Sequence, residues 1–589
     1  MIQRKISIWE VTKKVNHLCL KHCTVDYLLE RSTLFIRSVV IVATFFTTQL
    51  VFDQATALYQ DEATVGRLFI PIFLFSVANL GNEVLRGIEQ YFRRAVSTRF
   101  EGIIRKKMAQ KTNQLNPLAF EDPKLLDEIN KAKEASEYYF WTGETLIRIL
   151  LSYGTYLFFL SIYFYLLNPI LLLAVAFAFI PKLIPLGIKP LLYSKLQDTS
   201  APIRREYEFY EQAMIGRTYF KETRILGAFS LFKKKYLATL MILNRERWKT
   251  DAKSATLDLI MSFLSVLGYL GLLYLLFISL QTGAISIGAF AVVFASFADL
   301  IDRVDEILEI LGYTMEDLGT VSSLVRFFDL PERAGEEKDI DWTGDIEIKN
   351  ISFTYPNTEF ESLKNLSLTL KAGETVAIVG ENGAGKSTLM KILMGIYEPI
   401  TGSVTVGQQD TKGIANASRF NGVSAVFQNF QKYQLTLKEN VEISEGNGNT
   451  DITLSMEQAG VEYDSKAYPD GVDTMLSREF DGVDLSGGQW QRVAIARGLY
   501  RYHDLIVLDE PTAAIDPLEE SRLYEKFAEI SKDKTAIIVT HRLGSAQIAD
   551  RIVVLDNGAI SEMGTHQELL DRKGHYARMY EAQASWYVS

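Results

Sequence analysis

The sequence has few cysteines and no excess of basic residues, and each shortage excludes a class of protein. Only Cys19 and Cys23 are present among 589 residues, which excludes a framework of several disulfides and fits a reducing compartment. Residues 1–341 hold 39 Lys and Arg against 37 Asp and Glu (net +2), and residues 342–589 hold 23 against 35 (net −12). Neither half has the basic surface that a phosphate backbone needs, so we expect no nucleic-acid partner.

Both cysteines lie beside histidines, in the run HLCLKHC with His17 and His22. Such a run raises the question of a small metal site. Residues so close together on one short helix cannot easily all face one ion. We therefore expect reduced thiols that are structurally minor, with a metal site as the alternative.

Long apolar runs, by contrast, fill the first half of the chain. Hydrophobic residues make up 48% of the sequence and charged residues only 23%, a balance that indicates membrane spans. The first 31 residues are polar and basic, unlike a signal peptide. Runs of roughly spanning length predict six membrane helices, near 32–52, 66–85, 145–167, 169–189, 257–280 and 284–303.

The distribution of Lys and Arg predicts the orientation of these helices. The connections 53–65, 168–169 and 281–283 contain neither residue, whereas the N-terminal segment and the stretches 86–144 and 190–256 are rich in both. Basic segments stay on the cytoplasmic side, so we expect both termini in the cytoplasm and the chain in the inner (plasma) membrane. The two long stretches read as helical extensions of the spans, with turns near 115–123 and 216–227.

Two charged side chains, Lys182 and Asp299, fall inside predicted spans. Charges at such depth are often functional, but each residue also lies far enough toward the inner end of its span to reach the headgroups. The sequence leaves both interpretations open.

The second half begins with an acidic linker and continues as alternating short strands and helices. Its segment TVAIVGENGAGKSTLMKIL places a β-rich run before a glycine loop and a helix after it, and matches G-x4-G-K-[ST] at Gly380, Gly385, Lys386 and Ser387. Backbone N–H groups of such a loop bind phosphate oxygens, Lys386 supplies a positive charge, and Ser387 supplies a hydroxyl for Mg²⁺. The segment predicts a site for ATP with Mg²⁺.

Two further strands end in polar residues that fit the same site. The run DLIVLDEP ends a buried strand with Asp509 and Glu510, and the strand 536–539 is followed by His541. Ligands bind at the carboxyl edge of open parallel sheets, so these side chains should meet the phosphate loop. Asp509 would hold Mg²⁺, and Glu510 would act as general base on the attacking water.

Between these segments lies an insertion of more than a hundred residues that contains LSGGQ, residues 485–489, just before a helical run. A small hydroxyl and two glycines at a helix start make a second phosphate-binding surface. This motif, together with the phosphate loop and the strand-end carboxylates, resembles ABC transporters of the exporter type. The resemblance covers nearly the whole chain.

That resemblance implies roles for individual residues. Tyr355 in SFTYP would stack on adenine, Gln428 in VFQN would contact Mg²⁺, His541 would hold the γ-phosphate, and Asp516 in PTAAIDP would link two sites across a dimer. Catalysis would rest on Glu510, His541 and Gln428, and the metal on Ser387, Gln428 and Asp509. The nucleotide contacts implied are Tyr355, Gly380, Asn382, Gly383, Gly385, Lys386, Ser387, Thr388, Gln428, Ser486, Gly487, Gly488, Gln489, Asp509, Asp516 and His541.

The resemblance also implies an architecture and a partner. We expect a six-helix transmembrane domain with long cytoplasmic helical extensions over 1–335 and an α/β P-loop ATPase domain with a helical subdomain over 343–589. The LSGGQ motif of one chain would close over ATP on a second copy, giving a homodimer in membrane lipid; a heterodimer is not excluded.

The cargo is the least constrained expectation. The segments SREFDGVDLSGGQWQ and FKETRILG resemble bacterial exporters of ribosomally made peptides, including lantibiotics, more than multidrug or lipid exporters. A peptide exporter is therefore the main interpretation, and a multidrug exporter or lipid flippase is the alternative. An ATP-gated regulator without cargo is a further class, which the intact Glu510 argues against.

Overall fold

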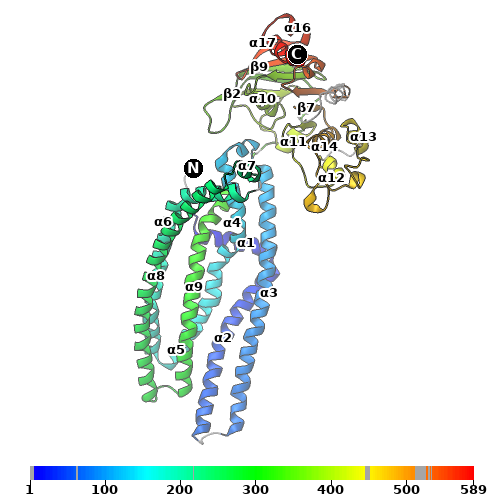
Figure 1. Cartoon of the computed structure of the whole chain (residues 1–589). Helices are drawn as coiled ribbons and strands as arrows, with labels where there is room; N and C mark the ends of the chain where they lie inside the picture. The colour runs from blue at the N-terminus through cyan, green and yellow to red at the C-terminus, as the bar shows by residue number, and fades with distance from the viewer. Residues whose placement is uncertain are drawn as a thin grey trace. The chain divides into compact units, whose positions relative to one another are not determined.

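A computed structural model of the chain describes residues 6–60, 64–216, 218–333, 335–444, 451–510, 526–527, 529, 531 and 534–588 (Figure 1). The chain divides into two compact units: a helical unit of residues 1–111 and 127–330, and a sheet unit of residues 112–126 and 331–589. The domain limits 1–335 and 343–589 expected from the sequence stay a prediction. Residues 112–126, which lie inside the first of those ranges, cluster with the C-terminal part of the chain.

The helical unit consists of long helices joined by short turns. Their bounds are α1 Ile8–His22, α2 Thr24–Tyr59, α3 Phe69–Gln114, α4 Pro123–Arg148, α5 Thr155–Leu167, α6 Pro169–Ile215, α7 Phe220–Ile225, α8 Phe229–Gln281 and α9 Ile287–Phe328. A 3₁₀ turn, η1 (Val65–Leu68), precedes α3, and a π-helical stretch, η3 (Ile149–Gly154), joins α4 to α5. Between α5 and α6, Asn168 caps the new helix by accepting from the N–H of Ile170 at 3.0 Å, and Pro169 takes its first position.

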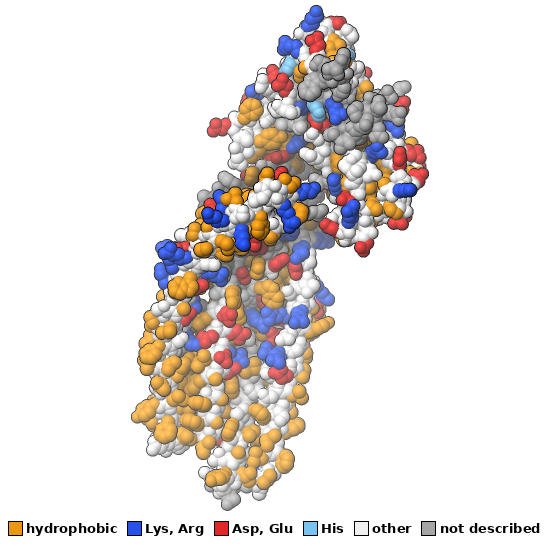
Figure 2. Space-filling model, viewed as in Figure 1, with side chains coloured by type: hydrophobic (Ala, Val, Ile, Leu, Met, Phe, Trp, Pro, Cys, Tyr) orange, Lys and Arg blue, Asp and Glu red, His pale blue; other side chains and the backbone are white. Residues whose placement is uncertain are grey.

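Within the described residues, five helices are long and apolar enough to cross a membrane: Thr24–Tyr59, Val65–Gln114, Glu128–Leu167, Pro169–Tyr193 and Phe229–Gln281. Apolar side chains cover the half of the helical unit around α5 and the facing ends of α2, α3 and α8 (Figure 2). The sixth predicted span falls in α9, which carries Asp299, Asp302 and Arg303 soon after its start. The chain is a multi-pass membrane protein, and the number of six spans remains a prediction.

The helices run well beyond a bilayer. The 53 residues of α8 span about 80 Å at 1.5 Å per residue, against a hydrocarbon core of about 30 Å. Turns occur near the two places expected from the sequence: α3 ends at Gln114 before α4 begins at Pro123, and α6 ends at Ile215 before α8 begins at Phe229.

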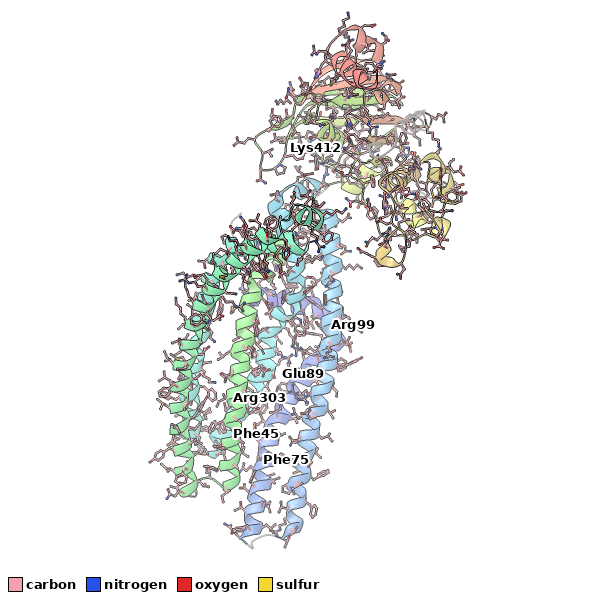
Figure 3. All side chains as sticks on the ribbon, in the orientation of Figure 1. Phe45, Phe75, Glu89, Arg99, Arg303 and Lys412 are labelled. Carbon is pink, nitrogen blue, oxygen red and sulfur yellow. The ribbon has the colours of Figure 1, made fainter. Side chains whose placement is uncertain are left out.

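Several charged side chains inside the helical unit are paired. Lys182 lies 2.7 Å from Asp305, and Asp299 accepts from Tyr156 at 2.6 Å and from Arg303 at 2.7 Å. Figure 3 labels two of the charged residues of this unit, Glu89 on α3 and Arg303 on α9. Lys182 and Asp299 therefore join α6, α5 and α9 through polar contacts.

The N-terminal helix α1 does not bring its cysteines and histidines together. Cys19 and Cys23 are buried free thiols, whereas His17 and His22 are exposed. Among the described residues no group of three or more His, Cys, Asp or Glu side chains could hold a metal ion.

The sheet unit contains two sheets. The strands are β1 Ile346–Thr354, β2 Glu361–Leu370, β3 Thr375–Gly380, β4 Thr401–Val406, β5 Gln409–Asp410, β6 Val423–Val426, β7 Leu505–Asp509, β8 Thr535–Val539, β9 Arg551–Asp556 and β10 Ala559–Gly564. Its helices are α10 Lys386–Leu393, α11 Asn416–Phe420, α12 Leu437–Glu442, α13 Ile452–Gln458, α14 Gly487–Tyr500, α16 His566–Asp571 and α17 His575–Val588. Its 3₁₀ turns are η2 Pro117–Glu121, η4 Gly471–Asp473, η5 Arg478–Phe480 and η6 Ser545–Ile548.

The larger sheet places the functional strand ends at one edge. Its order is β10-β9-β3-β8-β7-β6, with β9, β3, β8, β7 and β6 parallel. All five residues of β7 and of β8 are buried, as expected for strands covered on both faces. The smaller sheet, β2-β1-β4-β5, is antiparallel and shares the core that includes Ile378 and Val507.

Residues 112–126 dock on the sheet unit through both apolar and polar contacts. Leu118 packs against the core cluster that contains Phe353 and Tyr397. The hydroxyl of Tyr397 donates to Glu121, and Lys391 Nζ lies 3.2 Å from the same carboxylate. These contacts explain why this short segment separates from its neighbours in sequence.

Candidate nucleotide site

The glycine loop between β3 and α10 forms a cradle of backbone groups. Gly385 has φ +99°, and a Cβ there would lie 2.6 Å from the carbonyl oxygen of Ser362, so only glycine fits. Lys386 starts α10 and donates from Nζ to the carbonyls of Gly380 (2.8 Å) and Glu381 (2.9 Å). The ammonium group is thus held inside the loop.

Two carboxylates stand at the end of β7 but have different surroundings. Asp509 is 8% exposed, whereas Glu510 leaves the strand with φ +48° and its N–H donates to Val539 O at 2.9 Å. The left-handed conformation of Glu510 is unusual for a residue with a side chain. With this conformation the chain leaves the extended path of β7, in which successive side chains point to opposite faces. Two consecutive carboxylates can therefore lie at the same carboxyl edge of the sheet.

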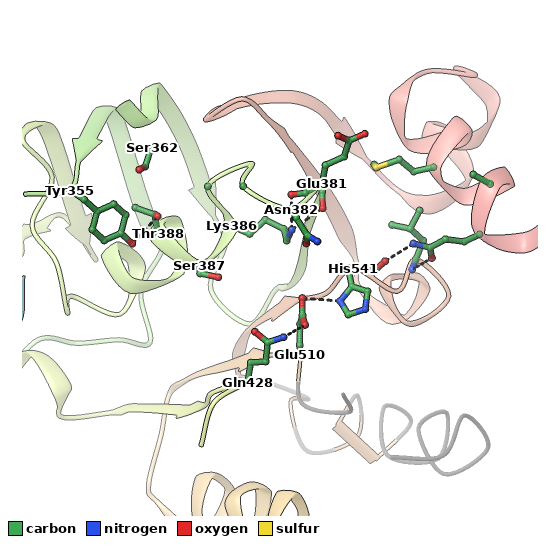
Figure 4. A pocket seen from close by; sticks show the side chains of 17 residues that line it. Tyr355, Ser362, Glu381, Asn382, Lys386, Ser387, Thr388, Gln428, Glu510 and His541 are labelled. Carbon is green, nitrogen blue, oxygen red and sulfur yellow. Dashed lines mark hydrogen bonds and ion pairs between the residues drawn. The ribbon is translucent and has the colours of Figure 1, made fainter. Parts of the chain in front are cut away.

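Glu510 is held from both sides by neighbouring loops (Figure 4). Gln428 Nε2 donates to Glu510 Oε2 at 2.5 Å, and His541 Nδ1 pairs with Glu510 Oε1 at 2.8 Å. Gln428 follows β6 and His541 follows β8, the two neighbours of β7 in the sheet. Parallel strand order alone therefore brings the three residues together.

Burial and mutual repulsion shift the titration of the charged groups. Desolvation, with a smaller contribution from Glu510, raises the pKa of Asp509 to about 6 from its usual 3.8. Burial lowers the pKa of Lys386, and the charges of Glu510 and Asp509 oppose that shift. The site therefore concentrates negative charge beside one ammonium group.

Tyr355 lies at one end of the site, away from Glu510 (Figure 4). Its hydroxyl is 3.1 Å from Thr388 Oγ1, and its ring meets Phe353 edge-on at 5.2 Å between centroids. These contacts fix an aromatic face at the rim, where a flat base could stack.

An open cavity of about 780 Å³ joins these groups. Its lining includes the following residues predicted from the sequence: Tyr355, Gly380, Asn382, Gly383, Gly385, Lys386, Ser387, Thr388, Gln428, Glu510 and His541. Asp509 immediately precedes Glu510 at the end of β7, and Asp516 lies outside the described residues. The volume is within the usual range for a small-molecule site.

The LSGGQ motif lies elsewhere in the sheet unit, at the start of α14. Ser486 caps this helix by accepting from Gln489 N, and Gln489 Oε1 accepts in return from Ser486 N at 2.9 Å. Ser486, Gly487, Gly488 and Gln489 are not among the described residues that line the cavity.

Some lining residues carry no motif and were not predicted. Met579, Ala582 and Gln583 reach the cavity from the C-terminal helix α17, and Leu543 comes from the loop after β8. The spacing of Tyr576, Tyr580 and Gln583 on one helical face was the only available signal.

The oxygen-rich donor set fits a magnesium ion. Ser387 hydroxyl, Gln428 amide and Asp509 carboxylate oxygens are the hard ligands that Mg²⁺ prefers. The buried charge of Asp509, whose pKa is raised in the protein alone, would be stabilised by a cation beside it. The residues present therefore fit the ion.

Together, the phosphate loop, the strand-end carboxylates and the membrane-length helices define a membrane protein with an attached P-loop nucleotide site. Residues 363–513 match the sequence family described as ABC transporter. The chain thus contains an ABC transporter domain, and the predicted resemblance is confirmed.

Known proteins that resemble the chain are transport proteins. It is 38% identical over 273 residues to the subtilin transport ATP-binding protein SpaT of Bacillus subtilis, covering 45% of this chain and 44% of that protein. It is 34% identical over 300 residues to the ATP-dependent lipid A-core flippase of Photobacterium profundum, covering 50% and 51%. The chain thus matches about half the length of these curated relatives.

A solved structure shares the whole fold. A bacterial Atm1-family ABC exporter with ATP bound superposes with a TM-score of 0.78 over 94% of this chain and 99% of that one, at 20% identity. The chain therefore shares the fold of that exporter, a helical membrane domain followed by a C-terminal ABC ATPase domain.

Proposed function

We propose that two copies of this chain form an ATP-driven exporter that moves a peptide from the cytoplasm across the inner membrane. The observation that carries the proposal is Glu510 held between Gln428 and His541 in a cavity that also contains Lys386. A base, its two orienting groups and a phosphate-binding ammonium are the parts that phosphoryl transfer to water requires.

The residues would divide the work by position. Tyr355 would stack on the adenine, the loop from Gly380 to Thr388 would bind the phosphates, and Glu510 would accept a proton from the water that attacks the γ-phosphorus. His541 would hold the γ-phosphate. Ser387, Gln428 and Asp509 would hold Mg²⁺, which spreads the charge of the phosphates when bound.

A second copy would complete each site. Ser486 and Gly488 stand at the start of α14, outside the lining of their own chain's cavity, so they would serve ATP bound to the partner. ATP would then favour a closed dimer, because only that state completes the phosphate contacts, and hydrolysis would reset it. Both termini would lie in the cytoplasm, with six spans per chain.

The peptide cargo is supported by the relative named for subtilin transport. Lipid export is the second candidate, because a lipid A-core flippase matches over a slightly longer stretch. The segment around LSGGQ is weaker evidence for the cargo than its sequence implies: Trp490 in GGQWQ is 3% exposed and packs in a core cluster with residues of β6, β7 and β8. The resemblance of this segment to peptide exporters therefore reflects packing in part, and not the cargo alone.

The test is ATP hydrolysis by the purified chain in lipid vesicles, screened with cationic peptides, lipids and dyes. The proposal expects basal hydrolysis that peptides stimulate and that Glu510→Gln abolishes. Absence of hydrolysis in the native chain would contradict the ATPase. Stimulation by lipids alone would replace the peptide with the lipid alternative.

A further inference from the structure

The C-terminal helix α17 contacts the loop that carries His541 through Gln583. Gln583 Nε2 donates to the backbone carbonyl of His541 at 2.6 Å, and Gln583 Oε1 accepts from the N–H of Leu543 at 2.9 Å. One amide side chain thus binds one group of each of the two peptides that flank Arg542. A primary amide offers both a donor and an acceptor for this purpose.

The position of Gln583 is set at the other end of α17. The carboxylate of Glu562 accepts from the N–H groups of His575 (2.6 Å) and Tyr576 (3.0 Å), which caps the first turn. Tyr576 is fully buried against a core that includes Val379 and Leu543. The helix is therefore fixed before it reaches the loop.

Because α17 is a continuous helix, fixing its first turn also fixes the residues that lie nearer the nucleotide site. Gln583 lies seven residues after Tyr576, about two turns further on the same face. Met579, between them, and Gln583 line the cavity together with His541. One wall of the site is thus built partly by α17.

His541 needs such support, because its side chain is 48% exposed and pairs with Glu510 at 2.8 Å. An exposed imidazole on an unsupported loop would populate other rotamers and lose this alignment. The loop's own side-chain bonds hold Thr540 and Arg542, with Arg542 N donating to Thr540 Oγ1 at 2.9 Å. Gln583 fixes the peptide groups between His541 and Leu543.

We propose that Gln583 is a positioning residue for ATP hydrolysis, acting through the backbone of His541 to keep its imidazole against Glu510. This rests on the proposed ATPase function. It assigns the C-terminal helix a part in the hydrolytic site that none of the sequence motifs contains.

The experiment compares the full chain in lipid nanodiscs with three variants. Gln583→Ala removes both hydrogen bonds. Gln583→Glu keeps an acceptor for Leu543 N–H but loses the donor to the His541 carbonyl. Gln547→Ala is the matched control: Gln547 Nε2 donates to Tyr580 on α17 at 2.8 Å, so the change removes a bond to the same helix that does not involve the backbone of His541 or Leu543.

We expect kcat for ATP hydrolysis to fall about tenfold in both Gln583 variants, with the KM for ATP and the melting temperature close to native. Gln547→Ala should keep native kcat. Hydrogen exchange at Leu543 should accelerate in Gln583→Ala but not in Gln583→Glu, because only the former removes the acceptor.

Native kcat in Gln583→Glu would overturn the proposal, as would an equal loss in Gln547→Ala, which would assign the effect to general docking of α17. A native chain without any ATP hydrolysis would instead contradict the proposed function itself. The two failures are therefore distinguishable.

Discussion

At the scale of single residues, the site depends on how differently two adjacent carboxylates are placed. Asp509 ends a buried strand, while Glu510 turns out of it at φ +48° and meets Gln428 and His541. The sequence predicted that both residues lie at this strand end, because a strand that ends in Asp-Glu is a local pattern, and their roles stay predictions. It did not predict the role of Gln583: helical spacing places this residue on a face with Tyr576 and Tyr580, but its partners are backbone groups, which no sequence motif marks.

Replacing Glu510 by Gln removes the base without changing size. We expect ATP affinity to stay within a few-fold and turnover to fall by about 10²-fold or more. Asp504→Asn, at the other end of the same strand, is the control and should keep native turnover. Hydrolysis by Glu510→Gln at a near-native rate would refute the assignment.

Replacing Asp509 by Asn should stabilise the nucleotide-free protein while abolishing hydrolysis. Its pKa of about 6 means that, as pH rises from about 4, the unfolded chain loses this proton before the folded one, so the free energy of unfolding falls until about pH 6. Asp509→Asn has no buried charge at this position, so at pH 7.5 its free energy of unfolding should be higher than the native value by the order of 1–3 kcal/mol.

Melting temperatures of both proteins, measured without nucleotide between pH 5 and 7.5, check the prediction. The advantage of Asp509→Asn should shrink as the pH falls. A difference that does not change with pH would show that burial of the charge is not its cause.

At the scale of elements, the DGVD segment before α14 shows that a sequence motif can be required by the fold and not by the cargo. Gly482 lies so close to the Met475 carbonyl that a Cβ would overlap it. Its N–H donates to Ser477 O at 2.9 Å, which closes the turn after η5. The glycine of the DGVD run therefore has a packing reason independent of any cargo.

Gly482→Ala should destabilise the sheet unit by about 1–3 kcal/mol, because the backbone must move to admit a methyl group. Gly544→Ala is the matched control, since nothing lies within 4 Å of a Cβ there and its φ is −58°. Denaturant unfolding of both variants gives the comparison. Equal stabilities would contradict the close approach at Gly482.

At the scale of the whole molecule, the sequence predicted a helical membrane part and a C-terminal P-loop part because their periodicities differ. It could not predict that residues 112–126 cluster with the sheet unit, since that contact joins Glu121 to Tyr397, which lie 276 positions apart. Nor did apolarity alone settle the sixth span, because Asp299, Asp302 and Arg303 interrupt the apolar run of the continuous helix α9.

A mixed dimer tests the sharing of sites between chains. Pairing a Lys386→Ala chain with a Ser486→Arg chain would leave one composite site intact and disable the other. We expect ATP hydrolysis above that of either pure variant, measured after tandem affinity purification of the mixed species. Activity of Ser486→Arg in a strictly monomeric preparation would contradict the dimer.

The docking of residues 112–126 has a consequence for the covalent structure of the chain. The polypeptide passes between the two units three times, near residues 111, 126 and 330. A protease cut at a site engineered just after Leu330 would therefore leave an N-terminal fragment that still carries Leu118 and Glu121, packed against the C-terminal fragment. The two fragments should copurify in native buffer and separate only in denaturing electrophoresis. The same contacts would let two separately expressed pieces of the chain assemble in a cell.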